Sequence, residues 1–364
     1  MTVPFDHERL FIPGPVEVRR EILDAQGQWM IGHRSQAFAD LYARLQPRLK
    51  ESFGAGESHR VYTYTSSGSG IWESASRNCV RDDQPVLHLV NGAFSDRWAQ
   101  VSRANGKQVD VIEVPWGQAV KPEQVAEALK QKHYDAVAMV YNETSTGVLN
   151  PLPAIAKVVR GYEDTLLLVD AVSCWMGTPI EAEAWGLDVV LASSQKAFAL
   201  PPGIAFGAVS DRALARAETI THRGYYFDML VLEKYHKRNN TPATPPISLM
   251  FAADKQLDAI RAEGYENRFR RHTMLAERTH EWVRSRGFEM FSEEGYHSPT
   301  VSAVRNTPGI DFPAMQAFLK ERGIMLGGGY GKLKGETFRI AHMGDLQMAD
   351  LEALLTAMDA FLEA

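Results

Sequence analysis

The stretch TLLLVDAVSCWMGTPIEAEAWGLDVVLASSQKAFALPPGIAFGAVS, residues 165–210, decides the fold. It contains three short apolar runs, at 165–172, 188–194 and 205–210, which predict three strands. The first run is apolar without interruption, which is typical of a strand buried on both faces of a parallel sheet. The other two flank a Pro-Pro-Gly turn (201–203), and we expect this turn to add one antiparallel strand.

Upstream of this stretch, apolar runs alternate with helical patterns. The additional strands are expected at residues 60–65, 85–90, 108–114 and 135–142. Helices are expected at Trp72–Val80, Phe94–Asn105, Pro122–Lys132 and Leu152–Tyr162. Strands separated by helices pair in parallel through crossover connections, so the sequence predicts an α/β fold with a mainly parallel sheet.

The two ends of the chain follow other patterns. Residues 1–16 are expected to be extended or looped, because Pro13-Gly14-Pro15 suits neither a helix nor a central strand. Residues 18–49 are helical, with a polar turn at 32–35, and residues 222–248 are predicted to be irregular. The C-terminal part predicts helices at 248–263 and 266–286, a strand at 299–305, a helix after Phe312, a Gly-rich loop at 327–331, a strand at 337–341 and a last helix from Met348. This change of pattern places a domain border near Gly264.

Composition excludes several classes of protein. Lys and Arg number 39 against 45 Asp and Glu, and the net charge of −6 argues against a nucleic-acid-binding protein. Cys79 and Cys174 are too few for a disulfide framework or a metal cluster, and no metal site is predicted. No apolar stretch is long enough to span a bilayer, and the first residues do not read as a secretory signal. We therefore expect a cytoplasmic enzyme without a membrane partner.

Three motifs carry groups suited to chemistry. In TYTSSGSGIWESA (63–75) a strand leads through small residues into a helix, whose free N–H groups predict an anion site. Asp170 ends a buried strand, where parallel sheets bind ligands. Lys196 follows an apolar strand, and burial there favours its neutral amine. Each motif alone also has a structural explanation: a loop, a capping Asp or a surface Lys.

The three motifs together match what pyridoxal phosphate requires of a protein. The anion site anchors the phosphate, the carboxylate keeps the ring nitrogen protonated, and the lysine holds the aldehyde as an imine.

At this point the sequence resembles the class V aminotransferases of fold type I, and among them the serine–pyruvate and alanine–glyoxylate group. The resemblance covers nearly the whole chain and is carried by PGP (13–15), SSGSG (66–70), NGAF (91–94), NETSTGVLNPL (142–152), LLLVDAVS (166–173), SSQKAFALPPG (193–203), TPPISL (244–249) and IMLGGGYGKLKGETFRIAHMG (324–344). It implies a seven-stranded, mainly parallel sheet between helices in a large domain (17–263). A smaller α+β domain (264–364) is joined by residues 1–16. The resemblance also implies pyridoxal 5′-phosphate and a homodimer with active sites at the subunit interface.

The resemblance assigns cofactor contacts residue by residue. Lys196 matches the Schiff-base lysine and Asp170 the partner of the pyridine nitrogen. Val172 matches the residue that packs under the ring, Phe94 the aromatic residue stacked on it, and Thr144 the hydroxyl near the ring oxygen. In this reading, Phe94 stands where relatives often have Trp, and still offers a surface for offset stacking.

The phosphate contacts implied within the chain are Ser69, Gly70, Ile71 and Gln195. Many relatives have His at the position of Ile71, so here only its backbone N–H remains. Thr244 resembles a threonine that reaches the phosphate of the neighbouring subunit, and Thr241 is left open as the alternative.

The substrate side is assigned by the same resemblance. Arg339, in TFRIAHMG, matches the arginine that binds the substrate α-carboxylate, for which a guanidinium fork is well shaped. Gly14, in the PGP motif, is a further substrate-side position. His33 and Arg34, in IGHRS, resemble a stretch of phosphoserine aminotransferases near the substrate phosphate, and are either substrate contacts or part of a surface ion pair.

These features predict a ping-pong transfer of an amino group from serine or alanine to glyoxylate or pyruvate. Phosphoserine with 2-oxoglutarate is the alternative, because of His33 and Arg34. A lyase of the cysteine-desulfurase kind would need a nucleophilic Cys in the C-terminal part, whereas both cysteines precede residue 175. A non-catalytic cofactor-binding protein has no need of Arg339, and a nicotinamide dehydrogenase would need a glycine fingerprint that the sequence lacks.

Overall fold

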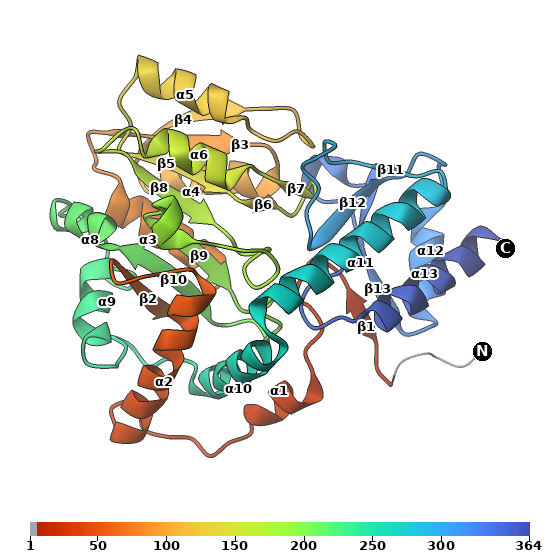
Figure 1. The fold of residues 1–364 in the computed structure, drawn as a ribbon, viewed down its shortest axis with the longest axis horizontal. Coiled ribbons are helices and arrows are strands. Elements are labelled where there is room, and N and C mark those ends of the chain that lie inside the picture. Colours follow the sequence, from red (N-terminus) through yellow and green to blue (C-terminus); the bar gives the residue numbers. More distant parts are fainter. Residues whose placement is uncertain (1–5) are drawn as a thin grey trace.

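The computed structural model describes residues 6–364 and is built around two β-sheets (Figure 1). The larger sheet has seven strands in the order β2-β10-β9-β8-β5-β3-β4. Every neighbouring pair is parallel except those of β10, which runs antiparallel to β9 and β2. The strands are β2 (His59–Tyr64), β3 (Pro85–Val90), β4 (Gln108–Glu113), β5 (Ala136–Val140), β8 (Leu166–Asp170), β9 (Val189–Ser193) and β10 (Ala205–Ser210). The predicted sheet, including its antiparallel strand, is therefore confirmed.

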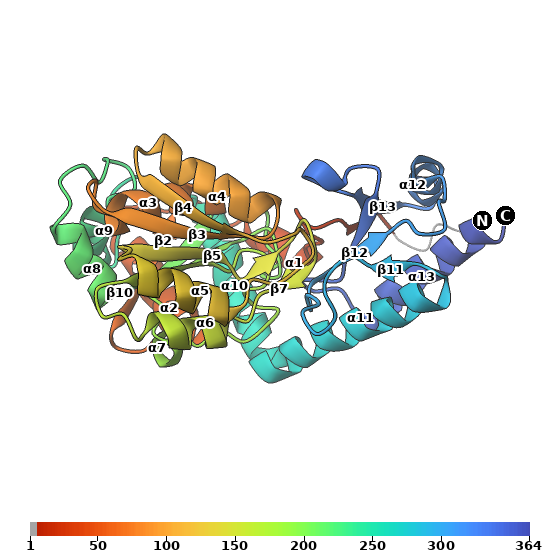
Figure 2. The ribbon, with the colours of Figure 1, turned by 90° about the horizontal axis from the view of Figure 1, so that it is seen from above.

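Helices cover both faces of this sheet (Figure 2). The side chains of β8 alternate between the two faces and are apolar on both. Leu166 and Leu168 pack on one face and Leu167 and Val169 on the other, so both faces need a cover. The first face lies under α3 (Gly68–Cys79), α4 (Ala93–Ala104), α8 (Asp211–Glu218) and α9 (Met229–His236). The second lies under α2 (Gln36–Ser52), α5 (Pro122–Gln131), α6 (Leu152–Val159) and α10 (Ile247–Glu263).

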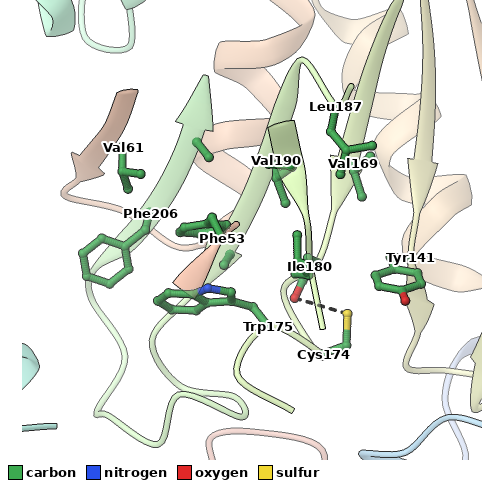
Figure 3. Packing of buried hydrophobic residues seen from close by; sticks show 14 of the residues in the cluster. Phe53, Val61, Tyr141, Val169, Cys174, Trp175, Ile180, Leu187, Val190 and Phe206 are labelled. Carbon is green, nitrogen blue, oxygen red and sulfur yellow. Dashed lines mark hydrogen bonds between the residues drawn. The ribbon is translucent and has the colours of Figure 1, made fainter. Parts of the chain in front are cut away.

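The second face holds a dense aromatic core (Figure 3). Trp175 stacks on Phe53 with ring centroids 4.8 Å apart, and it also contacts Phe206 at 5.6 Å. Cys174 is fully buried beside them, and its Sγ donates to the carbonyl of Ala171. Burial raises the pKa of the Cys174 thiol well above its usual range. This cysteine is therefore a packing residue.

The smaller sheet lies at the other end of the molecule and has the order β1-β13-β14-β12-β11 (Figure 2). Its strands are β1 (Arg9–Phe11), β11 (Glu289–Met290), β12 (Val301–Arg305), β13 (Ile324–Gly328) and β14 (Thr337–Ala341), packed on α11 (Tyr265–Ser285), α12 (Phe312–Lys320) and α13 (Met348–Leu362). β1 pairs in parallel with β13, so the N-terminal segment contributes a strand to this sheet. Residues 1–5 of the predicted segment 1–16 lie outside the described residues. The domain borders stay a prediction.

Several local predictions were wrong. Residues 222–248 are not irregular throughout, because α9 lies within them. The Asp228 side chain accepts from the N–H groups of Leu230 and Val231, and Leu232 is buried, so a cap and an apolar contact fix this helix. The predicted loop 327–331 is partly strand, since β13 continues to Gly328.

Other elements are shorter or additional. The helical stretch 18–49 is divided into α1 (Arg20–Ala25) and α2. The predicted turn at 32–35 lies in the break between them, which is longer than predicted. Helix α3 begins at Gly68 rather than Trp72. A small hairpin of β6 (Asn142–Glu143) and β7 (Val148–Leu149) and the short helix α7 (Ala182–Trp185) complete the fold. Within residues 6–364, no helix has both the length and the apolar character needed to cross a membrane.

Candidate functional site

A cavity of about 130 Å³ opens at the carboxyl ends of β2, β3, β5, β8 and β9. This edge is where open parallel sheets bind their ligands. Its lining is Ser67, Gly68, Ser69, Trp72, Phe94, Val140, Asn142, Thr144, Asp170, Val172, Ser173, Gln195 and Lys196. The structure thus brings together most of the residues predicted to contact a cofactor from segments spread over about a third of the chain.

Lys196 lies at one end of the cavity, under the N-terminal segment. Its ammonium donates to the carbonyl of Pro13, and Gly14 lies against its side chain. Gly14 has a φ of +110°, and a Cβ there would stand 2.5 Å from the lysine Nζ. Burial lowers the pKa of Lys196 to about 8, as does the charge of Arg339, whereas Asp170 raises it. The amine is therefore much easier to deprotonate than that of a surface lysine.

Asp170 lies across the cavity with both carboxylate oxygens occupied. Oδ2 accepts from Trp72 Nε1 at 2.6 Å, and Oδ1 accepts from the Val172 N–H at 2.7 Å. Burial raises the pKa of Asp170 to about 7, against the lowering effect of these two bonds and of Lys196. A carboxyl group held in this way gains from a nearby cation, which a protonated pyridine nitrogen supplies.

The raised pKa of Asp170 predicts a pH effect on stability. The folded protein holds a proton at pH 4–7 that the unfolded chain releases, so this group's contribution to the free energy of unfolding falls as pH rises through that range. Asp170→Asn removes the effect. In cofactor-free protein, the free energy of unfolding of the variant, measured relative to that of the wild type, should rise by on the order of a few kcal/mol between pH 5 and pH 8. Urea unfolding at both pH values measures the gain.

The control for this prediction is Asp24→Asn, an exposed carboxylate on α1. It should leave the pH dependence of unfolding as in the wild type. The same pH dependence in Asp170→Asn and the wild type would contradict the raised pKa.

The opposite end of the cavity is the start of α3. The cap residue Ser67 makes no side-chain capping bond, so the first N–H groups of this helix suit an anion. Gly68 allows the helix to approach Val172, whose Cγ2 would stand 2.6 Å from an added Cβ. Ile71 points into the core rather than the cavity, and neither it nor Gly70 is among the lining residues. Only backbone groups are therefore available at Ile71, as its side chain implies.

Arg339, on β14, brings a guanidinium close to the cavity from the smaller sheet. It is 9% exposed, and among residues 6–364 no carboxylate pairs with it. Its Nε donates to the carbonyl of Gly328 at 2.9 Å, and its Cζ lies 5.4 Å from the centroid of the Tyr330 ring. Burial lowers the pKa of Arg339 to about 10. A buried guanidinium without a counter-ion is a strong site for an incoming carboxylate.

The predicted site residues that do not line this cavity in the single chain fall into two groups. Gly14, Gly70, Ile71 and Arg339 lie beside the lining residues, whereas no contact in the single chain connects His33, Arg34, Thr244 or its alternative Thr241 with the lining. The Arg34 guanidinium donates to the carbonyls of Thr241 and Pro242 at 2.6 and 2.9 Å, and also to Asn240. The Thr241 hydroxyl donates to the carbonyl of Ala243 at 2.8 Å. Thr244 is exposed.

Sequence reasoning missed three polar or aromatic residues of the lining, namely Trp72, Asn142 and Ser173. Asn142 begins the NETSTG motif, but nothing in the motif showed that its Oδ1 is buried without a partner while its Nδ2 donates to Ser173 Oγ at 2.8 Å. Trp72 follows Ser69 by nearly one helical turn, and this spacing was the only available signal.

Comparisons with known proteins decide the family. The sequence profile described as Aminotransferase class-V matches residues 20–333.

The chain belongs to the class V aminotransferases.

This class V aminotransferase is 34% identical to the serine–glyoxylate aminotransferase of Methylorubrum extorquens, with 94% of this chain and 88% of that protein covered. It is also 34% identical to a protein of Synechococcus sp. named soluble hydrogenase, small subunit, over 98% of this chain and 93% of that one. The solved structure of an alanine–glyoxylate aminotransferase from Nostoc sp. superposes with a TM-score of 0.93 at 30% identity, covering 100% of this chain and 97% of that one. The predicted fold type I architecture is thereby confirmed.

Proposed function

We propose that this class V aminotransferase binds pyridoxal 5′-phosphate and transfers the amino group of a small L-amino acid, serine or alanine, to glyoxylate or pyruvate in a ping-pong reaction. The observation that carries the proposal is the meeting of three groups around one cavity. Two of them line the cavity, the Lys196 amine of lowered pKa and the buried Asp170 carboxyl group. The third is the Arg339 guanidinium, which lies close enough to lower the pKa of Lys196 and forms no ion pair in the described chain. The activities for which its relatives, the serine–glyoxylate and alanine–glyoxylate aminotransferases, are named support the choice of substrates.

The residues of the cavity fit this cofactor. Asp170 offers a carboxylate that would pair with the pyridine nitrogen, and Val172 and Phe94 offer apolar surfaces to a ring. Ser69 and the start of α3 suit the phosphate. The Oδ1 atom of Asn142 is buried without a hydrogen-bond partner, so it can accept a hydrogen bond from a ligand in the cavity. When bound, the cofactor supplies an electron sink for the electron pair that the substrate α-carbon releases.

The protein's own residues then divide the remaining work. Arg339 binds the α-carboxylate in its guanidinium fork and so orients the bond to the α-hydrogen. Lys196 Nζ, whose pKa of about 8 leaves a sizeable neutral fraction at that pH, would take the proton from the α-carbon. It would then deliver this proton to the carbon atom that receives the amino group, acting as base and then acid. Asp170 remains ionised opposite the ring nitrogen and holds its positive charge.

Trp72 is predicted to support the cofactor through Asp170. Trp72→Phe removes the indole N–H that donates to the carboxylate and keeps most of the ring packing. A hydrogen bond to a charged group contributes about 1.5–3 kcal/mol, so the affinity for pyridoxal phosphate should fall about 10- to 100-fold. Equilibrium dialysis with pyridoxal phosphate measures the loss.

The variant Trp98→Phe is the matched control for Trp72→Phe. Trp98 stacks on Trp72 with ring centroids 6.1 Å apart, and its Nε1 is buried with no partner in the described chain. Trp98→Phe should therefore leave the affinity nearly unchanged. An equal loss in both variants would show that aromatic packing, rather than the bond to Asp170, supports the site.

A half-reaction screen tests the proposed activity. Purified yellow protein is mixed with one L-amino acid and no oxo acid, and the visible absorbance is followed. Serine or alanine should bleach it without release of ammonia, and glyoxylate or pyruvate should restore it. Ammonia or sulfide release would instead indicate a lyase, and no bleaching by any amino acid would overturn the proposal. No described contact favours phosphoserine, because backbone carbonyls already engage Arg34.

We propose a homodimer as the working form, with Thr244 or Thr241 reaching the phosphate of the second subunit. Large apolar side chains on the surface support it, since Trp29 is 95% and Tyr225 is 92% exposed. Sedimentation should give twice the chain mass, and Trp29→Asp should shift the mass toward the monomer. A wild-type protein of monomeric mass would overturn this part of the proposal.

A further inference from the structure

Tyr330 connects the two parts of the site that come from different sheets. Its ring stacks on Phe94, with centroids 5.2 Å apart and planes 13° from parallel. Phe94 lines the cavity of Lys196, while the guanidinium of Arg339 lies 5.4 Å from the centroid of the same tyrosine ring. Tyr330 is therefore next to the group proposed to bind the carboxylate and next to a wall of the cofactor cavity.

The backbone around Tyr330 is tightly fitted. A Cβ at Gly329 would stand 2.1 Å from the carbonyl oxygen of Leu333, so a side chain cannot be placed there without a shift. Gly331 has a φ of +59°, and a Cβ there would be 3.2 Å from the side chain of Trp116, which follows strand β4 of the larger sheet. The two glycines let this turn close on itself and lie against the β4–α5 connection.

The tyrosine side chain is also fixed at its tip. Arg97 Nη2 donates to the Tyr330 hydroxyl at 2.7 Å, and the Arg97 guanidinium lies 5.6 Å from the Phe94 centroid and 5.7 Å from the Tyr330 centroid. A ring held by stacking, by a hydrogen bond and by two guanidinium contacts does not move aside without losing them.

We infer that Tyr330 is a specificity-determining residue that limits the substrate to amino acids with short side chains. This rests on the proposed function. An amino acid with its carboxylate on Arg339 and its α-carbon at Lys196 would lie alongside the Tyr330 ring, because that ring is next to both the Arg339 guanidinium and Phe94. A short side chain, such as that of alanine or serine, fits beside the ring, whereas a long or branched one needs the volume that the ring occupies.

The experiment compares holoenzyme variants in the half-reaction. Single-turnover rates are measured for alanine, leucine and phenylalanine with the wild type, Tyr330→Ala and Tyr330→Phe. Pocket discrimination of about one methylene is typically 10- to 200-fold, so Tyr330→Ala should raise the ratio of leucine to alanine kcat/KM by at least about 10-fold. Tyr330→Phe keeps the ring and should keep the wild-type ratio within a few fold.

A binding measurement separates selection from catalysis. Acetate and 3-phenylpropanoate, which do not react, are titrated into the holoenzyme and followed by the change in its absorbance. Tyr330→Ala should bind 3-phenylpropanoate more tightly and acetate about as before. Lys334→Ala, an exposed position four residues further on, serves as the control and should match the wild type in both measurements.

The outcomes are distinct. A wild type that bleaches with amino acids but shows the same selectivity as Tyr330→Ala overturns this inference and leaves the proposed function standing. A wild type that already prefers leucine or phenylalanine also overturns it.

The variant Arg97→Ala tests an alternative hypothesis, in which Arg97 binds a second carboxylate of the substrate. Selective loss of aspartate turnover, with the leucine ratio unchanged in Tyr330→Ala, would support that reading against ours. A wild type that bleaches with no amino acid overturns the proposed function and the inference with it.

Discussion

Replacing Lys196 by alanine is expected to abolish both the visible absorbance of the protein and its amino-transfer activity. The absorbance depends on the covalent link between the ε-amine and the cofactor, and alanine offers no amine. Proton transfer by a positioned base contributes about 10²- to 10⁴-fold to a rate, so turnover should fall by at least that factor. The lowered pKa of Lys196 makes it the base suited to this step near neutral pH.

The measurements are an absorbance spectrum of protein saturated with pyridoxal phosphate and a coupled assay of glyoxylate-dependent turnover. Lys130→Ala is the control, because the Lys130 side chain is 68% exposed on α5, and it should behave as the wild type. Retention of the absorbance band together with full turnover in Lys196→Ala would overturn the assignment of the lysine.

Arg339→Met should separate activity from stability. Loss of the guanidinium removes two charge-assisted bonds to the substrate carboxylate, and kcat/KM should fall about 10²- to 10⁴-fold. The absorbance of the cofactor should be retained, unlike in the lysine variant. Because the Arg339 charge is buried without a carboxylate partner, its replacement by an apolar chain of similar length should leave the free energy of unfolding equal or higher.

Arg268→Met supplies the comparison. Arg268, on α11, is also buried, at 1% exposure, but it pairs with Asp345 at 2.8 Å and Glu263 at 2.9 Å. Breaking a buried ion pair costs about 3–5 kcal/mol, so this variant should be strongly destabilised in urea unfolding. If Arg339→Met proves as destabilised as Arg268→Met, Arg339 has a structural role, and its assignment to the substrate loses its main support.

The larger sheet was predictable because each strand carries its own signal. Runs such as PVLHLV (85–90) are apolar except for one residue, His88, and a run of this kind is typical of a strand buried on both faces of a covered sheet. The Pro-Pro-Gly turn likewise predicted that the chain reverses its direction between β9 and β10. The weakest sequence signals belonged to β1, β6 and β7, which are only two or three residues long. Their pairing depends on distant partners rather than on local pattern.

The site was predictable to the extent that motifs carried it. Lys196, Asp170 and Phe94 stand in recognisable motifs at strand ends, and the fold brings those ends to one edge. Trp72 and Tyr330 could not be predicted as site residues, because their roles arise from contacts with Asp170 and with Phe94, which are far away in the sequence. Helix α9 was missed for a different reason, since its cap at Asp228 is a local signal that directly follows three aromatic residues, Tyr225, Tyr226 and Phe227.

The stacked indole pair of Trp72 and Trp98 has an optical consequence. Tryptophan emission begins in the near ultraviolet, and its long-wavelength side overlaps the visible absorption of pyridoxal phosphate bound to a lysine. Trp72 lines the cavity that we assign to the cofactor. Excitation energy should therefore pass from this pair to the bound cofactor over a very short distance. The tryptophan fluorescence of the chain should decrease when the cofactor binds and recover when it is removed. This signal would report occupancy of the site in real time without any added dye.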